Sequence, residues 1–153
     1  SSHQEFCTQL RDTMLSLPSP APLFYEGILP FNAGNFSLSP IHVKNVASFF
    51  TKSLLNENTI GKTYALGGLK SFKWKHLILL IAKSSKKLTW QIPAPIMIVK
   101  LIASIFDRYK WFPVTSDQLT MLMEGNTVKE NYFNDFGIEP INFDEVSLKY
   151  LEP

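Results

Sequence analysis

The order in which two kinds of apolar segment follow one another constrains this sequence most. Short segments with a strand-like pattern occupy residues 36–42, 62–66 and 88–92. Each precedes a segment whose apolar residues recur at helical spacing, and these lie at 43–55, 71–84 and 95–106. Another helical segment, 4–16, comes first, and others follow residue 115. Strands that alternate with helices are typical of α/β proteins, so we expect a mixed α/β fold.

The helical segments carry apolar faces that we expect to be buried. These faces comprise Phe6, Leu10 and Met14 in the first helix, Val46, Phe49, Phe50 and Leu54 in the second, and Trp74, Leu77, Ile78 and Ile81 in the third. Residues placed to cap helices are His42 with Asn45 three residues later, Ser71, Thr115 with Gln118, and Asn142 with Glu145. The last two pairs predict helices that contain Leu119 and Leu148.

Composition indicates one domain with a hydrophobic core, because 45% of the 153 residues are hydrophobic and 18% are charged. A single cysteine, Cys7, excludes an internal disulfide and a cysteine-based zinc site. The three histidines are too far apart for metal-ligand spacing, so we expect no metal. Cys7 and His3 share a helix face and could form a nucleophile pair. No third group is identified to orient them, and a buried, inert cysteine is the expected alternative.

The net charge of +2 is the sum of unequal parts. Residues 62–110 carry ten Lys/Arg and one acidic residue, whereas residues 111–153 carry two Lys/Arg and eight acidic residues. Either the two parts neutralise each other in the fold, or the basic part forms a face for an anionic partner. Aromatic residues lie among the lysines, as in some nucleic-acid binders, but helical spacing places Trp74 in the core. We therefore expect no nucleic-acid partner.

The longest apolar stretch, Pro93 to Phe106, is interrupted by Lys100 and is shorter than the roughly 18 residues that a membrane-spanning helix needs. Because helix 96–106 is apolar most of the way round, we expect it to be buried, or docked on a protein partner or a membrane surface. The first residues lack a basic region and an apolar region, so no secretory signal is predicted. We expect a cytoplasmic protein, with a peripheral position at a membrane as the alternative.

Local catalytic motifs are absent from the sequence. It contains no Gly-x-Gly-x-x-Gly, no Gly-x-x-x-x-Gly-Lys and no Gly-x-Ser-x-Gly. It also lacks the Tyr-x-x-x-Lys of dehydrogenase chemistry. Gly67 and Gly68 follow a predicted strand and precede a predicted helix, which is the right context for phosphate binding, but a pair of glycines alone is a weak signal and a simple turn is the favoured explanation.

Five segments, in conserved order and spacing, resemble the extended short-chain dehydrogenase/reductases, which are NAD-dependent epimerase/dehydratase-like proteins. Ser39-Pro-Ile-His-Val-Lys-Asn-Val-Ala resembles the family's Pro-(Val/Ile)-His-Val-x-Asp-Val-Ala, with Asn45 where Asp is common. Gly61-Lys-Thr-Tyr-Ala-Leu-Gly-Gly resembles its Gly-x-x-Tyr-x-Leu-Gly-Gly strand and turn. Residues 88–95, 114–122 and 136–140 are similar to its closing segments. The branch that these segments resemble is the atypical one, related to the nucleotide-binding accessory subunit of respiratory complex I.

This resemblance implies that residues 1–153 form a single C-terminal, substrate-side domain: the C-terminal part of a Rossmann-like parallel sheet plus a small, mainly helical lobe. The N-terminal nucleotide-binding half would be absent. NAD or NADP would bind the full-length parent oxidoreductase, and we expect no cofactor and no activity for this chain alone. Ligands bind at the carboxyl ends of parallel strands in such folds, so His42, Asn45, Gly67 and Gly68 are the candidate cleft residues.

Two kinds of partner follow from this interpretation. One is the missing Rossmann half, and the other is a second copy that pairs through an exposed sheet edge. The alternative function is a non-catalytic interaction module, which would dock through its apolar helix 96–106 on a protein partner or a membrane surface.

Overall fold

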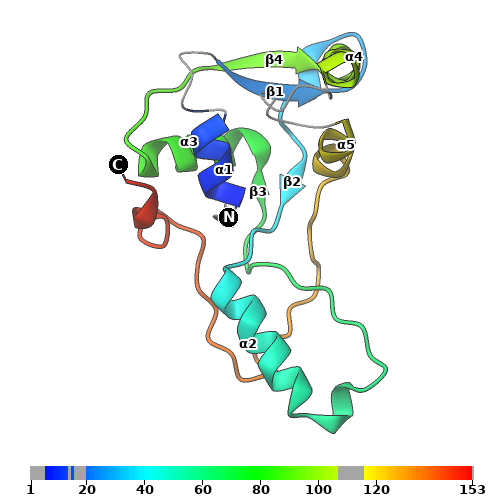
Figure 1. The fold of residues 1–153 in the computed structure, drawn as a ribbon, viewed down its shortest axis with the longest axis vertical. Helices are drawn as coiled ribbons and strands as arrows, with labels where there is room; N and C mark the ends of the chain where they lie inside the picture. Colours follow the sequence, from blue (N-terminus) through cyan, green and yellow to red (C-terminus); the bar gives the residue numbers. More distant parts are fainter. Residues whose placement is uncertain (1–5, 14, 16–19, 107–115, 153) are drawn as a thin grey trace.

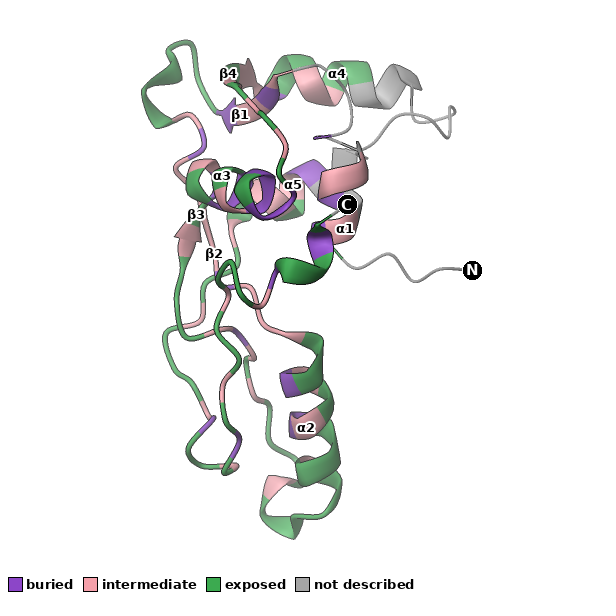
Figure 2. Cartoon of the chain, turned by 90° about the vertical axis from the view of Figure 1, so that its left-hand side faces the viewer, coloured by how far each residue is buried: buried purple, intermediate pink, exposed green. Residues whose placement is uncertain are grey.

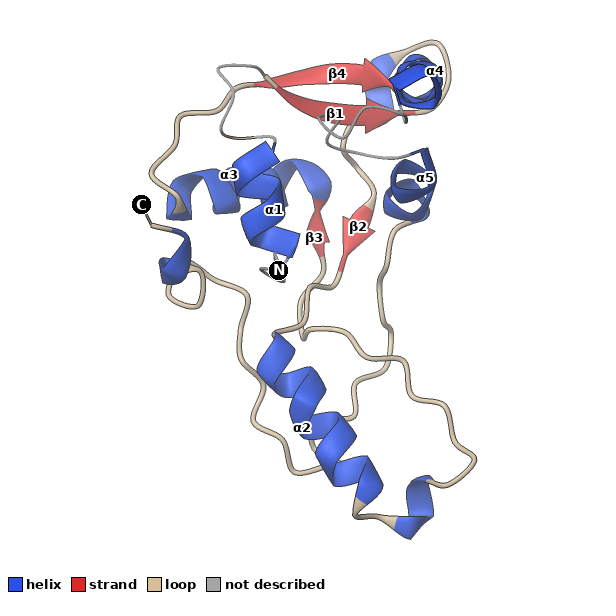
Figure 3. Ribbon diagram, viewed as in Figure 1, coloured by secondary structure: helices blue, strands red, loops and turns tan. Residues whose placement is uncertain are grey.

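The computed structural model describes residues 6–13, 15, 20–106 and 116–152. Figure 1 shows a body that contains the described strands and most of the helices, and an arm that extends from this body. The arm is formed by α2 (Val43–Leu54) and by the extended segments beside it. Figure 3 shows that long loops connect the two parts. The described chain is therefore mixed α/β, as the sequence predicts.

The strands of the body form two small sheets. In chain order the body contains α1 (Phe6–Thr13), β1 (Ala21–Tyr25), β2 (Ser37–Leu38), β3 (Phe72–Lys73), α3 (Trp74–Ser84), β4 (Gln91–Pro95), α4 (Ile96–Phe106) and α5 (Ser116–Glu124). β1 and β4 are parallel, with Ala21 opposite Gln91. β2 and β3 are antiparallel, with Ser37 opposite Lys73, and Leu38 forms a parallel bridge with Asn126.

Two strand predictions hold only in part, and two strands were missed: β1, and β3 at the start of the predicted helix 71–84. The strand expected at 88–92 begins only at Gln91, and the one expected at 36–42 is limited to Ser37 and Leu38. β1 was not predicted because three prolines lie between residues 18 and 22. Proline is tolerated at a sheet edge, where no ladder hydrogen bond is lost, and Pro22 occupies such a position.

Prolines close both outer edges of the β1–β4 sheet. The amide of Ala21 donates to Trp90 O, so the odd-numbered residues of β1 face β4, and Pro22 and Phe24 face outward. By the same alternation, Pro93 and Pro95 lie on the outer edge of β4 and offer no N–H group. The sheet therefore does not favour the predicted self-association through an exposed edge.

The core lies beneath the parallel sheet, around α3. Its four predicted core residues, Trp74, Leu77, Ile78 and Ile81, are all buried, which confirms that face of the helix. The indole nitrogen of Trp74 donates to Pro22 O at 2.9 Å. Its ring stacks against Phe24 and Phe36, with centroid distances of 6.2 Å and 5.5 Å. Figure 2 shows buried residues in α1, β1, α3 and the start of α4.

Two helix predictions were wrong in detail. In α1, Phe6 is 46% exposed and Cys7 is buried beside Leu10, so the core face is rotated from the expected one. Ser71 does not cap α3, because Lys73 is the N-cap residue and the Ser71 hydroxyl lies 2.8 Å from the Ser39 hydroxyl. His3, Met14 and Thr115 lie outside the described residues.

The helix predicted after Asn142 is reduced to a turn of 3₁₀ helix, η3 (Lys149–Leu151). Asp144 rather than Asn142 closes the preceding turn, since its carboxylate accepts from the amide of Ser147 at 2.9 Å. This competing local hydrogen bond explains why the capping pattern did not start an α-helix. Leu148 and Leu151 are nevertheless buried in the main core.

The basic and acidic parts of the chain meet in the body. Lys83 lies 2.7 Å from a carboxylate oxygen of Glu145, and Lys86 lies 3.3 Å from one of Glu152. Both pairs are exposed, and exposed pairs each contribute little to stability. They show that the fold brings the two parts together, as one of the two interpretations of the charge pattern expects.

Leu77 and Leu79 allow a matched test of the core. Leu77 is fully buried, whereas Leu79 on the same helix is 46% exposed. We expect Leu77→Ala to lower the free energy of unfolding by about 2–5 kcal/mol, because it leaves a cavity. Leu79→Ala should cost less than about 1 kcal/mol. Urea unfolding followed by tryptophan fluorescence measures both, and equal losses would contradict this placement of α3.

Candidate functional site

The four candidate cleft residues gather where the arm leaves the body. His42 is the N-cap of α2, and its Nδ1 accepts from the amide of Lys44 at 3.1 Å, as the sequence predicts. Asn45 lies in the first turn of the same helix. Gly68 donates its amide to Ser39 O at 3.2 Å, beside the residues that lead into α2. The structure thus brings together two segments that are more than twenty residues apart in the sequence.

The glycines permit a close approach of these segments. A Cβ atom on Gly68 would lie 2.0 Å from Pro40 O, and one on Gly67 would lie 2.6 Å from a methyl carbon of Val128. No side chain larger than hydrogen fits at Gly68 without a backbone shift, because the obstructing atom is a backbone oxygen. The pair therefore acts here as a packed junction, and a role in a ligand cleft stays a prediction.

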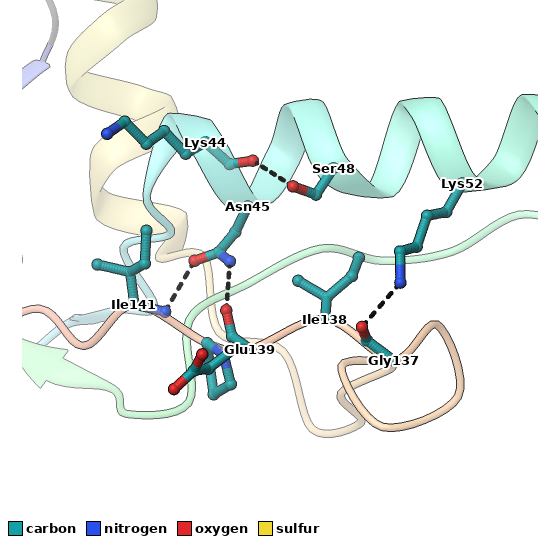
Figure 4. A pocket seen from close by; sticks show the side chains of 9 residues that line it. Lys44, Asn45, Ser48, Lys52, Gly137, Ile138, Glu139 and Ile141 are labelled. Atoms are coloured by element: carbon teal, nitrogen blue, oxygen red, sulfur yellow. Dashed lines mark hydrogen bonds between the residues drawn. The ribbon is translucent and has the colours of Figure 1, made fainter.

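Asn45 does not assist the cap of α2, contrary to its predicted place in a capping arrangement. Its side chain is buried and points across to the C-terminal part of the chain. Its amide nitrogen donates to Glu139 O at 2.8 Å, and its oxygen accepts from the amide of Ile141 at 2.9 Å (Figure 4). The side-chain amide of Asn45 thus donates to and accepts from the backbone between Glu139 and Ile141, as the backbone of a neighbouring strand would.

A second apolar cluster holds the inner face of α2. It consists of Phe49, Phe133 and Ile138, with Ile41, Leu66, Tyr132 and Phe136 packed against it. Phe49 meets Phe133 and Phe136 edge to face, with centroids 5.1 Å and 5.3 Å apart. Tyr64 meets Tyr132 and Phe136 in the same way. A hydrogen bond to Glu130 raises the pKa of Tyr132 above its ordinary value.

The segment from residue 62 to residue 66, predicted as a strand, is extended but unpaired, so that prediction was wrong for this structure. Its side chains still alternate, since Tyr64 and Leu66 are half-buried on the aromatic cluster while Thr63 and Ala65 are exposed. Among the described residues, no backbone group from Thr63 to Leu66 forms a hydrogen bond. The physical reason is that no neighbouring strand lies beside it to complete a ladder.

The outer face of α2 is apolar and uncovered, which overturns part of its predicted core face. Phe49 is buried as expected, but Phe50 is 67% exposed and Leu54 is 86% exposed. Val43, Ala47, Phe50 and Leu54 recur at helical spacing and form one exposed stripe. No described element packs on this side, because the inner cluster already lies on the opposite face.

A hollow of about 430 Å³ lies between α2 and the C-terminal segment (Figure 4). Its lining comprises Lys44, Asn45, Ser48 and Lys52 of α2 and residues 137–141. Lys52 donates to Phe136 O and to Gly137 O, both at 2.7 Å, and Ser48 donates to Lys44 O. Most of its polar groups are therefore engaged with backbone. Sequence reasoning missed the lysine and the C-terminal segment as partners of α2.

The described residues contain no cluster of three or more metal-ligating side chains. They also hold no helix long and apolar enough to cross a membrane. None of the engaged groups around Asn45 forms a nucleophile and base pair, since the hydroxyl and the amide are used in backbone hydrogen bonds. The described polar groups of this region therefore hold α2 and the C-terminal segment together.

No protein-family model matches the chain. Among curated proteins, the chain is similar to the NADH-ubiquinone oxidoreductase 40 kDa subunit, mitochondrial, of Neurospora crassa, with 24% identity over 148 aligned residues. The match covers 87% of this chain and 40% of that subunit, so the chain spans less than half the length of this relative. The chain is thus a distant relative of a subunit of respiratory complex I, in agreement with that part of the resemblance.

Asn45 provides a pH-dependent test of the junction. Asn45→Asp keeps the shape but replaces the donor to Glu139 O by a carboxylate oxygen. We expect the free energy of unfolding to fall by about 1–3 kcal/mol near pH 7. Burial raises the pKa of the introduced carboxyl, so the penalty is present above that pKa and shrinks as the pH falls through it.

Urea unfolding near pH 7 and near pH 5 measures this difference. Asn45→Ala is the control, because it also loses both hydrogen bonds but adds no titrating group. Its loss of stability relative to the unsubstituted chain should be the same at both values of pH. A penalty for Asn45→Asp that does not shrink at the lower pH would contradict the assigned hydrogen bond.

Proposed function

We propose that this chain is the substrate-side, C-terminal part of a protein of the extended short-chain dehydrogenase/reductase type. In this proposal it completes the fold of a nucleotide-binding part and supplies one wall of the substrate cleft. The cofactor, NAD or NADP, is held mainly by the nucleotide-binding part. The chain alone binds no cofactor and has no oxidoreductase activity.

The unpaired segment 62–66 is the observation that carries this proposal. It has the alternating pattern of a strand, and one of its faces is already packed on the aromatic cluster. Its backbone groups from Thr63 to Leu66 have no hydrogen-bond partners among the described residues. Peptide groups at a sheet position are normally paired, so a strand from the nucleotide-binding part fits beside it.

The exposed stripe of α2 supports the same proposal. α2 lies directly before this segment in the chain, and its stripe of Val43, Ala47, Phe50 and Leu54 faces outward. The stripe lies on the face of α2 opposite the cluster that holds segment 62–66, so a second surface of the nucleotide-binding part would cover it. The similarity to an NADH-ubiquinone oxidoreductase subunit of more than twice the matched length is consistent with this arrangement.

Cofactor binding is the first test. We expect isothermal titration calorimetry to show no saturable binding of NADH or NADPH to the 153-residue chain. The coding region upstream of Ser1 should contain, in frame, a glycine-rich strand–turn–helix motif, and the longer chain should bind one of the two nucleotides. Micromolar binding by the short chain, or an upstream region without such a motif, would contradict the proposal.

Phe50 gives a second test that compares the two lengths. In the short chain Phe50 is 67% exposed, so Phe50→Glu should change the free energy of unfolding by less than about 0.5 kcal/mol. In the longer chain the same change would bury a carboxylate against the nucleotide-binding part and should cost several kcal/mol. Thr51→Glu, on the neighbouring exposed position, is the control and should be tolerated in both chains. Equal tolerance of both substitutions in the longer chain would contradict docking through this stripe.

A further inference from the structure

A second apolar surface lies at the end of the molecule opposite the arm. On α4 it comprises Met97, Ile98, Leu101 and Ile102, which are 79%, 55%, 62% and 39% exposed. It also includes Ile92 on β4, Trp90 just before β4, and Ile28 and Phe31 in the loop after β1. Figures 1 and 2 both show these elements at the top of the molecule, with α2 at the bottom. We call these eight residues the α4 surface.

The face of α4 that bears this surface is broad. The four exposed residues lie at spacings of one, three and four along the helix, which place them on one side, while Ile96 and Val99 pack into the core on the other. The side chains of these four residues nevertheless stay between 39% and 79% exposed. Exposed apolar surface of this extent on one end of a protein marks an interaction site.

The prolines at the sheet edges argue against a protein strand as the occupant of the α4 surface. The sheet beside α4 ends in Pro22 on one edge and in Pro93 and Pro95 on the other, so an added protein strand would find few N–H donors. The outward carbonyls of β1 are also occupied, since Pro22 O accepts from Trp74 and Phe24 O accepts from Gly34. An occupant of the α4 surface must therefore cover side chains without extending the sheet.

The charge of Lys100 favours a lipid membrane over a second copy of the chain as the occupant of the α4 surface. Lys100 is the one charged residue between Gln91 and Ile102, and it is half-buried at the border of the exposed face. In a two-fold dimer built on α4, this ammonium group would lie near its own copy without an acidic residue of that segment to pair it. Against an anionic lipid surface, the same group can extend to the headgroups while the aliphatic side chains enter the acyl boundary.

The dimensions fit a helix that lies on a membrane rather than one that crosses it. α4 has 11 residues, so it is only about 16 Å long, against a hydrocarbon core of about 30 Å. Trp90 is 61% exposed just before β4, at the end of that strand away from α4 and about 20 Å from the start of α4. Tryptophan is enriched at the boundary between lipid and water, where it would mark the edge of the contact.

We propose that the α4 surface binds peripherally to an anionic lipid membrane, with Met97, Ile98, Leu101 and Ile102 at the acyl boundary and Lys100 at the headgroups. This proposal is independent of the proposed function, because it uses the opposite end of the molecule. The α2 stripe would stay available for the nucleotide-binding part while α4 lies on the lipid.

Co-sedimentation with vesicles tests the proposal on the 153-residue chain. The probes are phosphatidylcholine vesicles and phosphatidylcholine vesicles that contain about one third phosphatidylserine. We expect binding to the anionic vesicles, and about a tenfold or greater loss of the partition coefficient in Ile98→Glu/Leu101→Glu. Phe50→Glu/Leu54→Glu is the matched control, since it also places two carboxylates on an exposed apolar helix face. The control should retain binding.

Substitution of Lys100 measures the electrostatic contribution to membrane binding separately from the apolar one. Lys100→Gln should reduce the preference for anionic over neutral vesicles by about fivefold, because one lysine near such a surface is removed. Circular dichroism checks that the helical content of each variant is unchanged. The Ile98 and Leu101 changes are at exposed positions, so the fold should tolerate them.

Four results would overturn the proposal. They are an absence of binding to either vesicle, a loss of binding in the α2 variant equal to or larger than that in the α4 variant, an unchanged preference in Lys100→Gln, and a lipid-free dimer in sedimentation equilibrium that the α4 variant dissociates. The last result would assign the surface to a second copy of the chain. Failure here leaves the nucleotide calorimetry unaffected, so the two proposals are tested separately.

Discussion

The hydrogen bond from the Trp74 indole to the carbonyl of Pro22 is the contact around which the body is organised. Pro22 lies on the edge of β1, so its carbonyl points away from β4 and needs a partner. The indole supplies that partner and stacks between Phe24 and Phe36. Because Trp74 is also the first residue of α3, this one side chain fixes the helix beneath the sheet. The remaining core residues then pack against a helix whose position is already set.

The arm depends on a different principle, because it has no sheet. The side-chain amide of Asn45 forms hydrogen bonds with backbone groups of the C-terminal segment. The aromatic cluster around Phe49 fills the space between α2 and that segment. This arrangement stabilises only the inner face of α2. The outer face of α2 therefore keeps apolar side chains, and segment 62–66 keeps peptide groups, that the described chain does not cover.

Periodicity in the sequence predicts helices and caps that depend on nearby residues. It fails where the structure of a segment depends on contacts with residues far away in the sequence. The faces of α3 and the cap of α2 follow from residue spacing, and both are found. Phe50 and Leu54 have the same apolar character as Phe49, so spacing alone cannot tell which side of α2 meets the cluster. Segment 62–66 has a strand pattern, but a strand also needs a neighbour. Of the candidate cleft residues, spacing anticipated the cap at His42 but not the bonds of Asn45, whose partners lie about a hundred residues further along the chain.

The two apolar surfaces differ in the backbone that accompanies them, and this difference decides what can cover each. The arm that carries the α2 stripe also carries, in segment 62–66, peptide groups without a hydrogen-bond partner among the described residues, and another polypeptide strand can satisfy such groups in register. Beside the α4 surface the sheet edges carry prolines and occupied carbonyls. A polypeptide strand gains nothing there, whereas a lipid surface requires no backbone hydrogen bonds from its partner. Apolar side chains alone do not identify an occupant, but the hydrogen-bonding capacity of the adjoining main chain distinguishes the end proposed to bind a protein from the end proposed to bind lipid.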